Sequence, residues 1–404
     1  MSSIAKSVLG SRERRIAVLA DELRADAGNA LHYPHDEADG RRFRRLRELT
    51  ARLLSFVDER PVEELTAILA ADTGLRTPWA AVALMINDQR HGLLAVRDER
   101  TGRYGTPHTL VGEDEDVDTA VARLASDLVP DSQVLPVPHG MCDSISAGLA
   151  TVHTYYLTYV VDLTFVPPED IRGDLVPVSR IDEGELDDLT VYIMGGADRT
   201  VLDAPLALPT ELRHLIAELG DLAGEGAADT TDRYNLERYD RISRTVVELL
   251  EGVGSEVPLR PGRIEGLAAR GSVTAAEAFV LDGRQRLLLM RRSDTGQWAM
   301  PGGASEVGES SAATAVREVA EELGVDIEID GLAGVYDLRT IRAPNPGTWV
   351  QFVYVATLAD PGARPHVTAE AGDWRWFRFD EIDGLDLFNG HRTKIDRVIE
   401  VLKG

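Results

Sequence analysis

Two neighbouring stretches decide the fold: Gly303-Ala-Ser-Glu-Val-Gly-Glu309 and, after seven intervening residues, Arg317-Glu-Val-Ala-Glu-Glu-Leu-Gly-Val325. Glu318, Glu321 and Glu322 are three and four residues apart, so on a helix their carboxylates share one face. Three acids on one face repel one another unless a cation neutralises them, and hard divalent cations such as Mg²⁺ or Mn²⁺ prefer oxygen ligands. The spacing therefore indicates a metal site on a helix.

Residues around the acidic helix support this interpretation. Gly302 and Gly303 permit backbone conformations that other residues avoid, so the Gly303 carbonyl can turn toward the metal. Arg317 can reach back to Glu309 and tie the preceding loop to the helix, and Gly324 has the position of a helix C-cap. An ordinary solvated acidic helix is the alternative, but it gives no reason for the upstream glycines and Glu309.

The pattern resembles the Nudix box, in which G, five residues, E and seven residues precede R-E-U-x-E-E-x-G-U, where U is aliphatic. Every fixed position is met here without a gap. The resemblance implies an α/β/α sandwich with a mixed sheet, and hydrolysis of a nucleoside diphosphate linked to another moiety with Mg²⁺ or Mn²⁺. The metal ligands that it implies are Gly303, Glu318, Glu321 and Glu322. Glu318 and Glu322 are also the expected catalytic acids, organised by Arg317 and Glu309.

The general base stays open, because the family draws it either from the box or from a separate loop. Glu370, just before an expected closing strand at Trp374–Phe379, is a candidate, and an ordinary loop acid is the alternative. Arg291 and Arg292 end a strand before the box and could grip phosphate, although alternation along a strand lets at most one point into the site. The aromatic candidates for stacking on a base, with core packing as the alternative, are Trp298, Tyr336, Trp349 and Phe388.

The first half of the chain repeats the second. Leu93 to Pro107 parallels Leu287 to Pro301 without a gap, and upstream the apolar pattern from Phe43 to Leu54 echoes that from Tyr239 to Leu250. Such self-similarity indicates a tandem duplication. An unrelated α/β domain with chance similarity is the alternative for the first half.

The first copy lacks the acidic residues of the box. Arg123 stands at the position of Glu318, and Asp127 is the one acid left where the second copy has three. Glu113 or Glu115 could replace Glu309. The remaining correspondences pair Ala122 with Arg317, Ser126 with Glu321, and His108-Thr109 with Gly302-Gly303. We therefore expect a degenerate domain that performs no hydrolysis and acts in structure or regulation.

Helical and strand-like patterns give the domain organisation: tandem Nudix-type α/β/α sandwiches with mixed sheets, each preceded by an amphipathic helix, Arg41–Val57 and Leu236–Val253. The second of these helices resembles an extension that helps form a dimer in one Nudix subgroup; covering its own domain is the alternative. The expected segments are an N-terminal helical segment (1–29), a degenerate Nudix-like domain (30–219), a linker (220–232), a helical extension (233–271) and a catalytic Nudix domain (272–404).

Composition limits the partners. The formal charge of −25 over 404 residues argues against nucleic acid or anionic membranes, whereas a small phosphorylated substrate is compatible because bound metal reverses the local charge. Apolar runs are too short to span a bilayer, so a cytoplasmic protein is expected. Cys142, as a single cysteine, excludes an internal disulfide. The expected partners are a nucleoside diphosphate derivative and either a second chain, in a homodimer, or the other Nudix-like half. A ligand-sensing protein or a scaffold without turnover is the alternative function.

Overall fold

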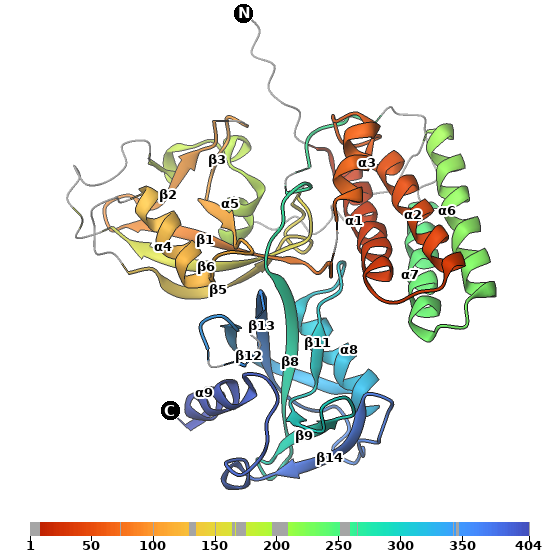
Figure 1. Cartoon of the computed structure of the whole chain (residues 1–404). Helices are drawn as coiled ribbons and strands as arrows, with labels where there is room; N and C mark the ends of the chain where they lie inside the picture. The colour runs from red at the N-terminus through yellow and green to blue at the C-terminus, as the bar shows by residue number, and fades with distance from the viewer. Residues whose placement is uncertain are drawn as a thin grey trace, which may run out of the picture. The chain divides into compact units, whose positions relative to one another are not determined.

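A computed structural model describes residues 9–72, 74–99, 101–128, 135–149, 151–163, 166, 175–195, 209–250, 259–264, 266–341, 343–344 and 347–403. The chain divides into two compact units (Figure 1). The first comprises Met1–Leu110 and Asp118–Arg270, and the second Val111–Val117 and Gly271–Gly404.

The second unit is a mixed sheet between helices. Its strands follow the order β10-β9-β8-β13-β12, with β11 on β8 and β14 on β9; β8 and β13 are parallel and the other pairs antiparallel. The strands are β8 (Val273–Leu281), β9 (Leu287–Arg292), β10 (Trp298–Ala299), β11 (Gly302–Ala304), β12 (Ile327–Asp337), β13 (Trp349–Leu358) and β14 (Ala371–Phe377). The expected sandwich of this half is confirmed.

Two helices cover this sheet, α8 (Ser311–Leu323) and α9 (His391–Lys403), one on each side (Figure 1). Helix α9 buries Ile395 and Val398 against Phe279 of β8, because apolar residues recur on one face at helical spacing. Helix α8 begins at the N-cap Ser310, whose hydroxyl accepts the Ala313 N–H, and ends at Gly324 with φ of 63°. The box is therefore helical as predicted.

The first unit contains a sheet of the same topology. Its order is β3-β2-β1-β6-β5, with β4 on β1 and β7 on β2, and β1 pairs with β6 in parallel. The elements are β1 (Trp79–Asp88), β2 (Gly92–Arg97), β3 (Tyr104–Gly105), β4 (His108–Leu110), α4 (Val117–Leu128), β5 (Val137–Asp143), β6 (Thr154–Asp162), β7 (Val176–Pro177) and α5 (Asp188–Ile193). Identical strand order and side pairings confirm the Nudix-like fold of the first half and exclude chance similarity.

Helices complete the first unit: α1 (Ser11–His32), α2 (Glu37–Leu54), α3 (Val62–Ala70), α6 (Thr210–Asp229) and α7 (Arg233–Leu250). The linker expected at 220–232 is wrong, since α6 runs through most of it and Leu222 and Ala223 are buried there. Its Gly, Ala and Asp content resembles a loop, but alanine favours helix and packing overrides the glycines. Among the described residues, no helix has the length and apolar character needed to cross a membrane.

The short segment Val111–Val117 belongs to the second unit by its hydrogen bonds. The Val111 carbonyl accepts the Ser272 N–H (2.9 Å), and Asp337 Oδ2 accepts the Val117 N–H (3.0 Å). Glu115 in this segment accepts the N–H of Gly112, three residues earlier, at 3.3 Å. The construction of the second unit thus includes residues that lie between β4 and α4 in the sequence.

Candidate functional site

The loop before α8 approaches the sheet so closely that it requires glycine. Gly302 pairs with Glu277 in β8 and has φ of 152°. A Cβ at Gly302 would lie 2.4 Å from the Ala276 carbonyl oxygen, so any other residue would collide with the backbone. The Gly302 N–H donates to Glu322 Oε2 at 2.8 Å, which joins the loop to the helix.

Gly303 leaves room for an acidic side chain of the helix. A Cβ at this position would lie 2.6 to 2.7 Å from the carboxylate atoms of Glu318. That approach is shorter than van der Waals contact, and the atoms that it would meet are the reactive end of the side chain. Glycine at 303 is therefore needed for the position of the Glu318 carboxylate.

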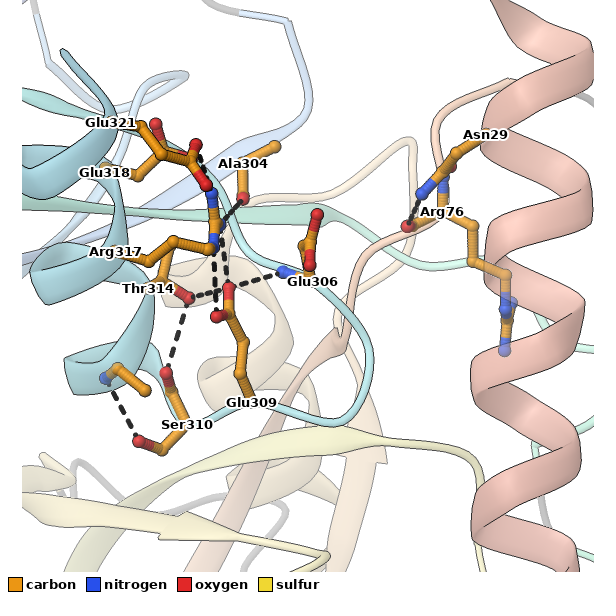
Figure 2. Close-up of polar contacts among 11 residues, drawn as sticks. Asn29, Arg76, Ala304, Glu306, Glu309, Ser310, Thr314, Arg317, Glu318 and Glu321 are labelled. Carbon is orange, nitrogen blue, oxygen red and sulfur yellow. Dashed lines mark hydrogen bonds and ion pairs between the residues drawn. The ribbon is translucent and has the colours of Figure 1, made fainter. Parts of the chain in front are cut away.

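Arg317 connects the loop with two acids of the helix, Glu318 and Glu321, as Figure 2 shows. Its guanidinium donates to both Glu309 oxygens (2.8 and 3.2 Å) and to the Ala304 carbonyl (3.1 Å). It also donates to Glu318 (2.8 Å) and Glu321 (3.1 Å). The predicted reach from Arg317 back to Glu309 is confirmed, and the two pairs with the helix acids are additional.

Glu309 organises the loop through neutral donors as well. Its Oε1 accepts the Glu306 N–H (2.9 Å) and the Thr314 hydroxyl (2.8 Å). A single oxygen of Glu309 therefore accepts from both the loop and the first turn of α8 (Figure 2).

Two of the acids are buried and hold protons more tightly than usual. Glu318 is 9 % exposed and Glu322 3 % exposed, whereas the Glu321 side chain is 43 % exposed. Burial raises the pKa of Glu318 to about 7, although Arg317 opposes the shift. Burial, then the charge of Glu318, raises the pKa of Glu322 well above its ordinary value. Such a pair is costly when ionised unless a cation compensates it.

The charges of Glu370 and Arg292 both affect the pKa of Glu322. The charge of Glu370 raises the pKa of Glu322, after the larger effects of burial and Glu318, while Arg292 lowers it. Arg292 also pairs with Asp294 (2.7 Å) and covers the Phe388 ring at 4.4 Å. The structure thus brings Glu370 and Arg292 to the acidic helix.

Arg291 and most of the aromatic candidates are accounted for by local packing. Arg291 is exposed and donates to the Gly296 carbonyl (2.8 Å), as expected if alternation turns one of the two arginines away. Trp298 meets Phe377 edge-on at 4.9 Å and packs on the core, as Trp349 does, and Tyr336 is buried within it. For these three rings the structure favours the core alternative over base stacking.

Within the described part of the chain, no group of three or more His, Cys, Asp or Glu side chains has a metal-binding arrangement. Arg317 donates to two of the acids in this structure, Glu318 and Glu321. The donor set is nevertheless chemically suited to Mg²⁺: carboxylates, two of them buried, beside a glycine carbonyl.

Comparisons with known proteins agree with this geometry. The sequence model of the NUDIX domain matches residues 271–398, and that of the "UDP-X-like, N-terminal oligomerisation domain" matches residues 14–69. The uncharacterized Nudix hydrolase YvcI of Bacillus subtilis is 30 % identical over 119 residues, which cover 29 % of this chain and 73 % of that protein. The chain belongs to the Nudix family.

Other proteins match different shares of the chain. A MutT-like protein of Streptomyces ambofaciens is 49 % identical over 55 residues, 14 % of this chain and 36 % of that protein. A putative 8-oxo-dGTP diphosphatase of Bacillus subtilis is 41 % identical over 61 residues, 15 % of this chain and 41 % of its own length. The crystal structure of UDP-X diphosphatase matches with 21 % identity and a TM-score of 0.39. The match includes 47 % of this chain and 93 % of that protein.

A buried charged cluster behind the Nudix loop was not predicted. Lys394 of α9 donates to both Glu277 carboxylate oxygens and to Gln351 Oε1 (2.7 Å), and His391 Nε2 lies 3.5 Å from Glu277. His391 Nδ1 accepts the Met300 N–H at 3.2 Å, and burial lowers the pKa of this imidazole well below its ordinary value. The available signal was an acid within the apolar strand β8 and a lysine on the apolar face of α9.

In the first copy, Thr109 and Arg123 stand at the positions of Gly303 and Glu318. Thr109 stands where Gly303 does, and its hydroxyl accepts from Arg123 Nη2 at 3.4 Å, at the place that Glu318 occupies in the second copy. Ala83 stands where Glu277 does, since the next residue bonds the loop proline carbonyl in both copies, Leu84 to Pro107 and Ala278 to Pro301, each at 2.9 Å. The first copy therefore lacks both the acid and the space for it.

Proposed function

We propose that this chain is a metal-dependent hydrolase that cleaves the pyrophosphate bond of a nucleoside diphosphate linked to another moiety. The observation that carries the proposal is the pair of buried acids, Glu318 and Glu322, held against Gly302 and Gly303. Buried carboxylates with raised pKa values are typical of functional sites, and here the charges of Arg317 and Arg292 oppose the raised pKa values without cancelling the effect of burial.

The residues fit Mg²⁺ or Mn²⁺. Glu318, Glu321, Glu322 and the Gly303 carbonyl would hold the cation, once the carboxylates of Glu318 and Glu321 exchange Arg317 for it. A bound divalent cation neutralises pyrophosphate oxygens and lowers the pKa of a water molecule. Arg317 would then keep its contacts with Glu309 and the Ala304 carbonyl, so the loop and the helix stay joined.

Other side chains near the acids are proposed to bind the substrate or to act as the general base. Arg292 is the proposed phosphate contact, because it lies near Glu322 and its partner Asp294 is exposed. Glu370 is the proposed general base, because its position near Glu322 places it beside the metal site; a glutamate of the box is the alternative. Arg291 and Trp298 remain weaker candidates for substrate contact.

The substrate class and location follow the same reasoning. Relatives named as an 8-oxo-dGTP diphosphatase and an ADP-ribose pyrophosphatase support a small nucleotide substrate, which fits a metal site rather than a macromolecular surface. Which diphosphate is cut depends on loops outside the box. We place the protein in the cytoplasm, which cell fractionation would test.

The test is turnover by the full chain of a panel of nucleoside diphosphate derivatives with Mg²⁺, Mn²⁺ or EDTA. Glu322→Gln keeps the shape and removes one charge from the pair, so turnover should fall on the order of 100-fold or more. Glu400→Gln, an exposed acid of α9, is the matched control and should behave as wild type. Turnover of Glu322→Gln near the wild-type rate would refute the proposal that the site around Glu322 carries the reaction.

One observation favours a second, non-catalytic function for the first copy. A cavity of about 610 Å³ lies at the counterpart of the Nudix cleft, lined by Arg97, His108 and Asp127 among others. Binding of a nucleotide there without cleavage would make it a sensing site. Calorimetry of Glu322→Gln with ADP-ribose and EDTA, repeated with Arg97→Ala added, tests this; equal affinity of the two variants would exclude it.

A further inference from the structure

The helices of the first unit contain a second repeat that the linker assignment concealed. Helices α2 and α7 both contain 18 residues and begin at residues 37 and 233, a spacing of 196. Their N-caps correspond at the same spacing: Asp36 accepts the Asp39 N–H (2.8 Å), and Asp232 accepts the Asn235 N–H (2.9 Å).

The preceding helices repeat in the same register. Five buried residues of α1 correspond to buried residues of α6 at the spacing of 196: Ile16 and Leu212, Leu19 and Leu215, Ala20 and Ile216, Leu23 and Leu219, Ala27 and Ala223. The whole pair of helices, α1 with α2 and α6 with α7, is therefore duplicated, and each pair precedes one Nudix fold in the sequence.

The two helix pairs pack as two copies of one surface. Helix α1 packs on α7 and α2 on α6, which is the exchange that a twofold interface requires (Figure 1). Corresponding residues meet directly: Phe43 and Tyr239 stack at 5.0 Å with an interplanar angle of 10°, and Asn235 donates to Asp39 at 2.9 Å.

Salt bridges at the edge follow the same exchange. Arg45 of α2 pairs with Glu218 of α6, and the corresponding Arg241 of α7 pairs with Asp26 of α1 at 2.8 Å. The acceptors differ by one helical turn, so the symmetry is close but inexact.

The positions at which the two helix pairs differ favour contact between a first-copy pair and a second-copy pair. Asp39 is fully buried and accepts from Tyr239 Oη (2.7 Å), Asn235 Nδ2 (2.9 Å) and Thr230 Oγ1 (2.8 Å). Two first-copy surfaces would place Asp39 against Asp39 with Phe43 in place of the tyrosine. Each buried carboxylate would then keep Arg42 of its own helix (3.3 Å) but lose the donors that the second copy supplies. Two second-copy surfaces would bring together donors without the carboxylate.

We propose that these four helices are an oligomerisation interface closed within one chain: the surface of α1 and α2 takes the chain's own α6 and α7 as its partner, and the protein is monomeric. The match of residues 14–69 to a domain described as an oligomerisation domain supports the origin of the surface. The pairing of Asp39 with Asn235 and Tyr239 selects the unlike copy.

Sedimentation equilibrium of the full chain tests the stoichiometry. The expected mass is that of one chain, 44.1 kDa, from about 1 to 100 μM. A dimer over this range would overturn the proposal, because the oligomerisation surface would not be satisfied internally.

A residue swap tests the pairing itself. Asn235→Asp places a second carboxylate against Asp39 and should lower the folding equilibrium constant by about 10- to 100-fold, measured by urea unfolding. Adding Asp39→Asn restores one acid and one amide and should recover most of the loss. Asp240→Asn, on the exposed face of α7, is the matched control. If the double variant is no more stable than Asn235→Asp, the assigned pairing is wrong. If Asn235→Asp does not fold, Tyr239→Phe replaces it: this variant removes one donor to Asp39, and adding Asp39→Asn should then recover most of the lost stability.

Discussion

Replacing Lys394 with Met should destabilise the second unit strongly, although it exchanges a charged side chain for an apolar one of similar length. Lys394 is fully buried, and its amine contacts both oxygens of Glu277, which is 3 % exposed. Burial lowers the pKa of Lys394, while Glu277 opposes that shift, so the charged pair exists only because both partners are present.

The size of the loss in unfolding free energy follows from the Glu277 carboxylate that remains buried without its partner. Removing one partner of a buried ion pair costs about 3–5 kcal/mol, because the other charge is left uncompensated. The methionine recovers less than this through packing. Since a domain is stabilised by roughly 5–15 kcal/mol, the loss is a large fraction of the total.

The assay is urea unfolding followed by tryptophan fluorescence, with Mn²⁺ binding measured on the folded protein. Metal affinity should also fall, because Glu277 lies directly under Gly302 and the loop depends on its position. Adding Glu277→Gln to Lys394→Met removes the unpaired charge and should recover about half of the loss or more. Lys403→Met, at the exposed end of α9, is the control.

A loss below about 1 kcal/mol for Lys394→Met would refute the reasoning, since exposed ion pairs have values of that size. So would a double variant less stable than the single one, because the proposed cause is the stranded carboxylate.

Three further predictions concern the metal site. The pKa of Glu318 is raised from 4.5 to about 7, so its protonated form favours the folded state. The free energy of unfolding without metal should therefore fall as pH rises from about 4.5 to 7, while Mg²⁺ affinity should rise over the same range. Opposite slopes in unfolding and calorimetric titrations would contradict this. Gly303→Ala should weaken Mn²⁺ binding at least about 10-fold by displacing the Glu318 carboxylate, whereas Gly283→Ala, which meets no atom within 4 Å, should not. Glu370→Gln should lower kcat and shift the acidic limb of the pH profile with metal affinity unchanged, and unaltered kinetics would return the role of base to the box.

The sequence predicted the elements whose signals are local. The box helix, its Gly324 cap and the hairpin around Asp282 follow from caps, turn residues and spacing, and the structure has them. The Arg317–Glu309 pair was predictable because its members are only eight positions apart, on one loop and the helix that follows it.

Long-range contacts were missed because no local pattern reports them. The cluster around Lys394 joins β8, β13 and α9, whose residues are up to 117 positions apart. The second half of α6, from Gly220, was assigned to a linker because its glycines and acids resemble a loop, although apolar positions of the helix repeat those of α1 at the spacing of 196. Trp298 was proposed for base stacking, but its place in the core depends on Phe377, which is distant in sequence.

The first copy shows that the fold of a Nudix loop and its chemistry have separate requirements. In the second copy the imidazole of His391 accepts the Met300 N–H; in the first, the Thr190 hydroxyl accepts the N–H of Thr106 at 2.7 Å. A neutral acceptor thus holds the loop in both copies. The proposed metal site needs more: a residue without a side chain at position 303, where the first copy has Thr109, and acids whose burial a cation can compensate.

The support behind the loop differs in the same sense. Glu277 and its lysine are needed where the loop must hold charged ligands in position, and the first copy has Ala83 instead. Its sandwich therefore keeps the sheet order and the backbone contacts of the second copy without the charges. A domain in that state still buries its own core and can carry a helix pair, and in this chain the helix pair of the first copy is the surface on which that of the second copy packs. The loss of the acids and the retention of the domain are thus compatible, because packing and metal binding depend on different residues.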